Sequence, residues 1–315
     1  MVRLRRQSWF VEQKPDSEDL IDTAQLTKHE TLDLQNNSLS FEIPDGIGKL
    51  VNISTLSLSL NKLSGGIPLS IQNLTNLETL ELENNNGLSE GKIPDWLKNQ
   101  TALLFLDLSM NKLEGSFPQW LADLKIETII FSDYRLSGSL PPSLFQSISL
   151  SVLALSRNNF SGQIPDMLGE TWVMTLMLTE NNFSGSRTLL EQAIRRSSIF
   201  FRQSQKLKAF NLSYNDISGL IPQSFGNLEK VEILDLSHNN LSGEIPQTLS
   251  KLSKLNVSEL KNNKLTGRIP ESPQLDRLND PNTYANNNKL CGMQIQEPCS
   301  TQTKQPEEDK EETVF

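Results

Sequence analysis

Few side chains in this sequence have the type and spacing that catalysis or metal binding requires. The two cysteines, Cys291 and Cys299, are separated by seven residues and can close a small loop as a disulfide if the protein is exported. The histidines, His29 and His238, lie far from them in the sequence, so no zinc site is predicted. No phosphate-binding loop, dinucleotide fingerprint, nucleophile elbow or kinase signature occurs. We therefore expect a binding or scaffold protein without enzymatic activity, metal or cofactor.

Charge and the lack of long apolar segments restrict the partners further. The formal net charge is −9, and the stretch 306–312 is strongly acidic. Binding of nucleic acid needs clustered lysines and arginines, and the basic cluster in residues 3–6 is too short, so no nucleic-acid partner is expected. Residues 1–10 are not followed by the apolar stretch of a signal peptide. No segment reaches the roughly 18 apolar residues that a membrane helix needs.

A unit of about 24 residues recurs along the chain and reads L-x-x-L-x-L-x-x-N-x-L-x-G-x-I-P. In one clear copy, Leu234 alternates with polar residues, which predicts a short strand with its leucines directed inward. Asn239 would bond backbone groups where the strand ends, and Gly243 would allow a turn. Pro246 would lead into a short helical turn over 247–251. The sequence therefore predicts an α/β solenoid, an arc of about ten leucine-rich repeats with a parallel sheet on its concave face and helical turns on its convex side.

The domain organisation follows from where this unit starts and stops. Residues 1–29 match no repeat and are expected to be poorly ordered. The solenoid is predicted over 30–270, with an insertion near 186–206 that we interpret as a longer convex-side loop rather than a binding element. Residues 271–300 are predicted to form a C-terminal cap, and 301–315 an acidic disordered tail.

Two repeats carry substitutions with structural consequences. Tyr134 takes the place of the repeat asparagine, so a ladder of stacked asparagines should break there. Ser258 stands where an inward leucine belongs, which should weaken the last repeat.

Outward-pointing strand residues are the candidate ligand contacts, because solenoids usually bind on the concave sheet face. An acidic pair and an apolar strip are the most informative, since an exposed apolar strip on a polar face suggests a partner surface. The alternative is drift of the repeat with no ligand. The candidates are Glu81, Glu83, Phe105, Ile130, Val152, Met177 and Asn211.

Acceptor motifs for N-glycosylation are abundant and are compatible with an exported surface. A glycan on Asn211 would lie on the concave face and block part of it. The candidate sites are Asn36, Asn52, Asn73, Asn99, Asn159, Asn182, Asn211, Asn240 and Asn256.

With its Gly-x-Ile-Pro, the repeat resembles that of plant receptor-like proteins and receptor-like kinases over residues 30–300. The closing segment, which contains Tyr284, Leu290-Cys291-Gly292 and Cys299, resembles the C-terminal cap of kinase-lacking cell-surface receptor-like proteins. In that family the two cysteines pair, so the resemblance implies a Cys291–Cys299 disulfide. It also implies a protein or peptide ligand, a co-receptor kinase, a role in defence or development, and a place on the outer face of the plasma membrane.

The ends of the chain differ from the family pattern. Family members begin with a signal peptide and a cysteine-bearing cap, and a membrane helix follows their acidic stretch. No signal peptide, cysteine-bearing N-terminal cap or membrane helix is found in the sequence. We therefore expect a receptor-like ectodomain truncated at both ends, attached to a membrane only if the full gene product supplies the helix. The alternative is a secreted inhibitor that resembles polygalacturonase-inhibiting proteins, which have about ten such repeats. Reading the genomic sequence beyond Phe315 would distinguish the two.

Overall fold

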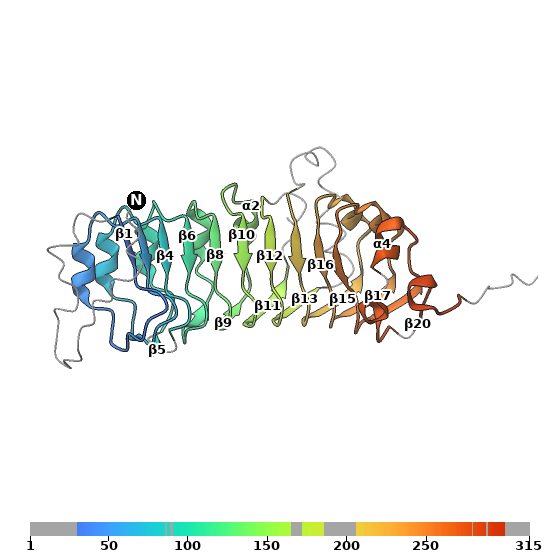
Figure 1. Cartoon of the computed structure of the whole chain (residues 1–315), viewed down its shortest axis with the longest axis horizontal. Helices are drawn as coiled ribbons and strands as arrows, with labels where there is room; N and C mark the ends of the chain where they lie inside the picture. The colour runs from blue at the N-terminus through green and yellow to red at the C-terminus, as the bar shows by residue number, and fades with distance from the viewer. Residues whose placement is uncertain are drawn as a thin grey trace, which may run out of the picture.

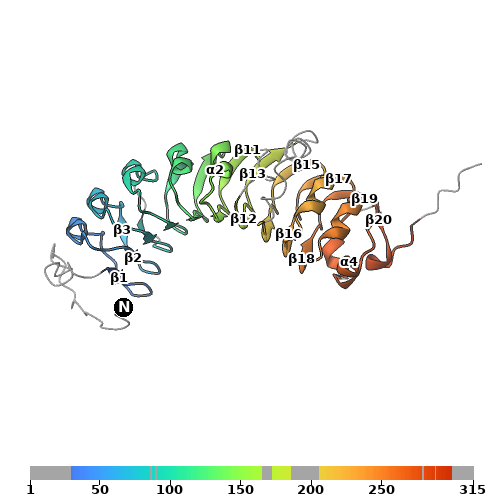
Figure 2. The ribbon, with the colours of Figure 1, turned by 90° about the horizontal axis from the view of Figure 1, so that it is seen from above.

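The computed structural model of the protein describes residues 30–85, 87–88, 91–164, 172–185, 206–278, 280–287 and 289–299. Within these residues, the repeats stack side by side into an elongated solenoid (Figure 1) that curves into an arc (Figure 2). The expectations for residues 1–29, for nearly all of the insertion near 186–206 and for the tail 301–315 concern residues outside the described part.

A ten-stranded parallel sheet lines the inner side of the arc (Figure 2), which confirms the predicted solenoid. Its strands follow one another in chain order, one per repeat, and nine of them contribute a buried apolar residue such as Leu56, Leu106 or Leu153 to a continuous core, whereas β18 contributes Ser258. The strands are β1 (Thr31–Asp33), β2 (Thr55–Ser57), β4 (Thr79–Glu81), β6 (Phe105–Asp107), β8 (Thr128–Ile130), β10 (Val152–Ala154), β12 (Thr175–Met177), β14 (Ala209–Asn211), β16 (Ile233–Asp235) and β18 (Val257–Glu259).

Short helices form the outer side of the arc, as the prolines of the repeat predicted. Each of these convex helices directly follows a proline in extended conformation; Pro246, for example, has φ −60° and ψ 133°. The convex helices are η1 (Asp45–Lys49), η2 (Leu69–Asn73), η3 (Asp95–Asn99), η4 (Gln119–Asp123), α2 (Pro142–Gln146), η5 (Gln223–Asn227) and η6 (Gln247–Lys251). The C-terminal part adds α4 (Pro273–Arg277), η7 (Pro281–Tyr284) and η8 (Met293–Ile295).

Consecutive convex helices touch so closely that one position in η5 admits only glycine. A Cβ added to Gly226 would lie 2.3 Å from the backbone oxygen of Thr248 in η6. We expect Gly226→Ala to lower the free energy of unfolding by about 3 kcal/mol, because a backbone atom cannot move aside as a side chain can. Urea unfolding followed by circular dichroism would measure this. Gln223→Ala, at an exposed position of the same helix, is the matched control. Equal midpoints for the two variants would refute the expectation.

A second parallel sheet of eight strands, not predicted from the sequence, runs along one flank of the solenoid. It is built from the segment between the repeat asparagine and the proline. Its strands are β7 (Glu114–Ser116), β9 (Arg135–Gly138), β11 (Asn159–Gln163), β13 (Asn182–Gly185), β15 (Asp216–Leu220), β17 (Asn240–Glu244), β19 (Lys264–Arg268) and β20 (Lys289–Cys291); a separate pair is β3 (Ser64–Gly65) and β5 (Gly87–Leu88).

The repeat asparagines form a ladder that joins neighbouring repeats, as predicted. The Nδ2 of Asn239 donates to Leu212 O of the preceding repeat at 2.9 Å and to Leu236 O of its own repeat at 3.2 Å. Its Oδ1 accepts from Ile217 N at 3.0 Å. One side chain therefore satisfies backbone groups where the sheet ends. The same pattern recurs at Asn61, Asn85, Asn111, Asn158, Asn181, Asn215, Asn263 and Asn287.

Both irregular residues of the repeat lie in the core. Tyr134 lacks the side-chain amide that forms the ladder. It is buried in the core, with its ring centroid 6.5 Å from that of Phe131. The ladder is interrupted at this repeat. Ser258 points inward and is 4% exposed, so the repeat that contains it has a smaller apolar core.

Candidate functional site

The strand register brings the predicted apolar residues together on the concave face. Phe105 and Val152 both pair with Thr128, so they lie in one row across β6, β8 and β10. Ile130 and Met177 both pair with Ala154 and occupy the next row. All four apolar side chains are half-buried, and each retains solvent-accessible surface.

Two more apolar residues extend this strip and were missed in the sequence. Leu104 and Met174, 38% and 37% exposed, lie just before β6 and β12. Their positions precede the alternating pattern, so periodicity gave no signal for them. We call Leu104, Phe105, Ile130, Val152, Met174 and Met177 the apolar concave patch.

The small residues of this face are less exposed than the sequence reasoning expected. Alternation with inward leucines predicted that Asp235 and Ser237 would point to solvent. Asp235 is half-buried and Ser237 is 2% exposed, with its Oγ donating to Asp235 Oδ1 at 2.7 Å. Neighbouring strands lie only about 4.8 Å apart, so longer side chains of adjacent repeats cover short ones. The ligand-accessible surface of the face therefore belongs to its large residues.

Three carboxylates are crowded where β4 meets β6. Glu81 pairs in register with Asp107, which is 6% exposed and accepts from Ser109 N at 2.9 Å. Burial, then the charge of Asp107, a hydrogen bond with the Asp107 side chain, and lastly the charge of Glu81 raise the pKa of Glu83 above its ordinary value. We call Glu81, Glu83 and Asp107 the acidic cluster.

This crowding predicts a pH-dependent gain in stability for Glu83→Gln. A raised pKa in the folded state means that the ionised carboxylate destabilises the fold, and the penalty persists above the folded pKa. It vanishes as the pH falls below the unfolded value of 4.5. The variant should therefore unfold at a higher temperature than the native chain at pH 7 and at the same temperature near about pH 3.5. A difference that does not change with pH would rule out this cause, and Glu114→Gln on the flank sheet is the control.

Charge on the concave face is divided unevenly between its two halves. We count as outward positions the residue before each strand, its first and third residues, and the second and third residues after it. In the repeats of β1, β2, β4, β6 and β8, none of these positions is a lysine or arginine, and the acids are Glu30, Asp33, Glu78, Glu81, Glu83, Asp107, Glu127 and Asp133. The basic residues, Arg157, Lys208 and Lys261, belong to later repeats.

Two of these three basic residues are paired within the chain. Arg157 binds Asp133 through two contacts, one of them 2.6 Å long, and Lys261 lies 3.3 Å from Glu259. The half of the face that contains the acidic cluster is therefore strongly negative.

Asn211 lies on β14 of the same face and is half-buried. Its Oδ1 accepts from both the N and the Oγ of Ser213, at 2.9 and 2.8 Å. Of the nine glycosylation candidates, Asn211 and Asn240 are half-buried and the other seven are exposed. Asn182 Nδ2 donates to Asn159 Oδ1 at 2.9 Å, so two candidate sites touch on the flank sheet.

A disulfide joins Cys291 to Cys299, the pairing that the family resemblance implied. Cys291 ends β20, the last strand of the flank sheet, and the loop is also closed by Gly292 N donating to Glu297 O at 2.8 Å. The bond therefore fixes the segment that covers the last repeat.

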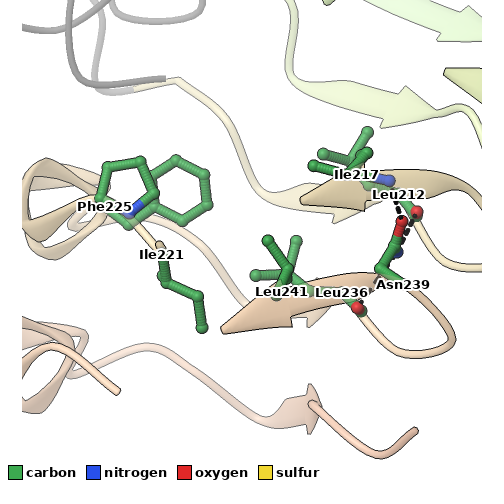
Figure 3. Close-up of a pocket in the computed structure, with 8 residues that line it drawn as sticks. Leu212, Ile217, Ile221, Phe225, Leu236, Asn239 and Leu241 are labelled. Carbon is green, nitrogen blue, oxygen red and sulfur yellow. Dashed lines mark hydrogen bonds between the residues drawn. The ribbon is translucent and has the colours of Figure 1, made fainter. Parts of the chain in front are cut away.

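The hollow in Figure 3 is a gap in the core and not a ligand site. Phe225 and Ile221 lie on one side of it, and Leu236 and Leu241 on the other. The asparagine among its lining residues, Asn239, already bonds the ladder. A site with so few available polar groups cannot orient a ligand.

The described residues contain no cluster of three or more histidine, cysteine or acidic side chains arranged to hold a metal. His238 belongs to the rim of the solenoid, where its ring stacks on Tyr214 at 3.8 Å and its Nε2 lies 3.0 Å from Asn262 Nδ2. In the described part of the chain, no helix combines the length and apolar character needed to cross a bilayer.

Comparison with known proteins identifies the class that this fold defines. A Leucine Rich Repeat family model matches residues 30–50, 52–74, 76–100, 102–124 and 149–170, and a second Leucine rich repeat model matches 196–241. The chain belongs to the leucine-rich-repeat family, with the repeat of plant receptor-like proteins.

One relative is a plant receptor. Over 53 residues the chain is 66% identical to Receptor-like protein 46 of Arabidopsis thaliana, a match that covers 14% of this chain and 6% of that protein. The matched part is thus a small fraction of the relative's length.

Solved structures give the same picture. A plant ice-binding protein is 28% identical with a TM-score of 0.73, covering 86% of this chain and 84% of its own. The ectodomain of the Arabidopsis thaliana receptor kinase GASSHO1/SCHENGEN3, in complex with CASPARIAN STRIP INTEGRITY FACTOR 2, is 31% identical with a TM-score of 0.70, over 87% of this chain and 34% of that one. A plant peptide hormone receptor, RGFR1 in complex with RGF2, is 28% identical with a TM-score of 0.58, over 78% and 46% of the two chains.

Proposed function

We propose that this chain is the ligand-binding ectodomain of a plant receptor-like protein that lacks a kinase. It binds a protein or peptide on its concave face and acts in defence or development through a partner kinase, at the outer face of the plasma membrane. The apolar concave patch carries this proposal, because six large apolar side chains gather there on four successive strands, whereas Ile233 and Val257 on β16 and β18 form a smaller exposed apolar group. The receptor relatives that were solved with peptide hormones support it.

The patch is a better candidate than the exposed apolar residues of the convex side. Leu69 and Ile148 are 59% and 78% exposed, but both lie on the convex side and are separated by several repeats. The patch residues come from four successive strands, so a single ligand can cover them together. Central, apolar and aromatic contacts of this kind usually provide most of the binding energy of an interface.

The test is to compare ligand capture by two variants of the secreted chain. Phe105→Ser with Val152→Ser removes the centre of the patch, and Leu69→Ser with Ile148→Ser removes as many apolar residues from the convex side. Immobilised proteins are exposed to the peptides and proteins of plant extracellular fluid. A species held by the native chain and the convex control, and lost from the patch variant, is the expected result. Equal retention by all three proteins would contradict the proposal.

The second candidate is an inhibitor that resembles polygalacturonase-inhibiting proteins, favoured by the ten strands of the concave sheet. Its partner would be a folded enzyme on the same face. Inhibition of a fungal polygalacturonase by the native chain, weakened in the patch variant, would favour this candidate over the receptor.

A further inference from the structure

We infer that the ligand of the concave face is cationic at one end: a lysine or arginine side chain binds at the acidic cluster, and apolar residues of the same segment cover the apolar concave patch. This inference rests on the proposed function and names the chemistry of its ligand.

The acidic cluster and the patch adjoin each other on the sheet. Asp107 ends the strand that Phe105 begins, and Asp107 pairs in register with Ile130 of the patch. Glu81 lies on the other side of Asp107, one strand further toward the N-terminus. A ligand that crosses the strands therefore meets carboxylates first and apolar side chains next.

The surroundings of the cluster provide no counter-charge of their own. The outward positions from β1 to β8 include no lysine or arginine, whereas Asp133 at the boundary is already paired with Arg157. Burial raises the pKa of Glu83 most, and the charges of Asp107 and Glu81 raise it further, because no cation offsets the repulsion among these crowded carboxylates. A ligand cation placed between them would relieve that repulsion, and burying it next to apolar groups would strengthen the attraction.

A second observation in the same row points to a hydrogen-bonding ligand. Ser57 pairs in register with Glu81 and is 3% exposed, yet its hydroxyl has no hydrogen-bond partner within the described structure. Buried polar groups in native proteins are nearly always bonded. A guanidinium group offers several donors in one plane and can serve a carboxylate and a neighbouring hydroxyl together.

An organic cation fits this surface better than a metal ion. No group of acidic side chains in the described residues has the arrangement needed to coordinate a metal. The carboxylates are instead spread over two strands, and the face from β4 to β12 spans five strands, or roughly 20 Å at about 4.8 Å between strands. An extended segment of about six residues covers that distance at about 3.3 Å per residue.

The experiment selects ligands from a random heptapeptide library displayed on phage, with the secreted native chain as target. We expect clones with lysine or arginine beside apolar residues. Glu81→Gln with Glu83→Gln should weaken these peptides at least about tenfold in titration calorimetry, while Glu114→Gln with Asp216→Asn on the flank sheet leaves them unchanged. Thermal unfolding of each variant verifies that it is folded.

Different failures have different meanings. Peptides that are sensitive to Phe105→Ser with Val152→Ser but not to the acidic double variant would overturn the cationic ligand and leave concave binding intact. Peptides insensitive to both, or a library that yields no binding clone, would count against the inference and the proposed function together.

Discussion

Replacing Asn85 by alanine should lower the free energy of unfolding by about 3 kcal/mol or more. This asparagine is fully buried. Its Nδ2 donates to Leu58 O and Leu82 O, both at 3.0 Å, and its Oδ1 accepts from Leu63 N at 3.1 Å. Alanine would leave those backbone groups in the core without this partner. Urea unfolding followed by circular dichroism measures the change.

The control for this variant is Asn227→Ala, at the exposed end of η5. Its expected effect is within about 0.5 kcal/mol, because no buried bond is lost. Contacts in a solenoid are mainly between neighbouring repeats, so the Asn85 variant should also unfold in more than one step. If both variants unfold at the native midpoint, the ladder does not stabilise the stack as proposed.

The features that could be predicted from the sequence are those in which one residue type has one physical role. Leucines in alternation specified the strands, and the repeat asparagine specified the ladder because its short amide provides two N–H donors and a carbonyl acceptor at the same position. Prolines such as Pro246 marked the start of each convex helix. The interruption at Tyr134 followed from the same reasoning.

Other features gave no signal because their residue types vary. The residue before each ladder position has a positive φ, yet it is Leu60 in one repeat, Met110 in another and Tyr214 in a third. Such a backbone is unusual for side chains with a Cβ, and stacking of the repeats imposes it. The flank sheet was missed for a similar reason: its strands contain Ser and Gly, which favour turns when considered locally.

The candidate site was predictable in part. The strand pattern identified the outward residues, and register then placed Phe105 and Val152 on either side of Thr128 and Glu81 beside Asp107. Crowding of the carboxylates depends on that register and could not be inferred from spacing alone. It also has a functional implication, since a cluster that costs stability is more easily explained by a ligand than by packing.

Tyr134 offers a test of how a solenoid tolerates a repeat that lacks the ladder asparagine. Its ring fills the core beside Phe131, and Tyr134→Ala should cost about 4 kcal/mol because it removes that volume and restores no amide. The side chain of Asn111 approaches the buried hydroxyl, but its amide already donates to Leu82 O and Leu108 O. The hydroxyl therefore has no well-formed hydrogen bond in the described structure, and Tyr134→Phe should instead stabilise the fold by about 1 kcal/mol. The opposite signs would separate the contribution of the ring from that of its hydroxyl.

The pH dependence of these variants gives the stricter check. Burial raises the pKa of Tyr134 above its ordinary value of 10.0, so the folded chain keeps a proton that the unfolded chain releases. Stability conferred by the neutral phenol is complete below pH 10 and falls as the pH rises, by about 1.4 kcal/mol per pH unit. The stability of Tyr134→Phe relative to that of the native chain should therefore increase between about pH 10 and pH 12. Tyr214→Phe, at a residue 51% exposed, should show no such gain. If the stability of all three proteins declines equally as the pH rises, the Tyr134 hydroxyl reaches solvent. The core around Tyr134 would then be more open than its burial indicates.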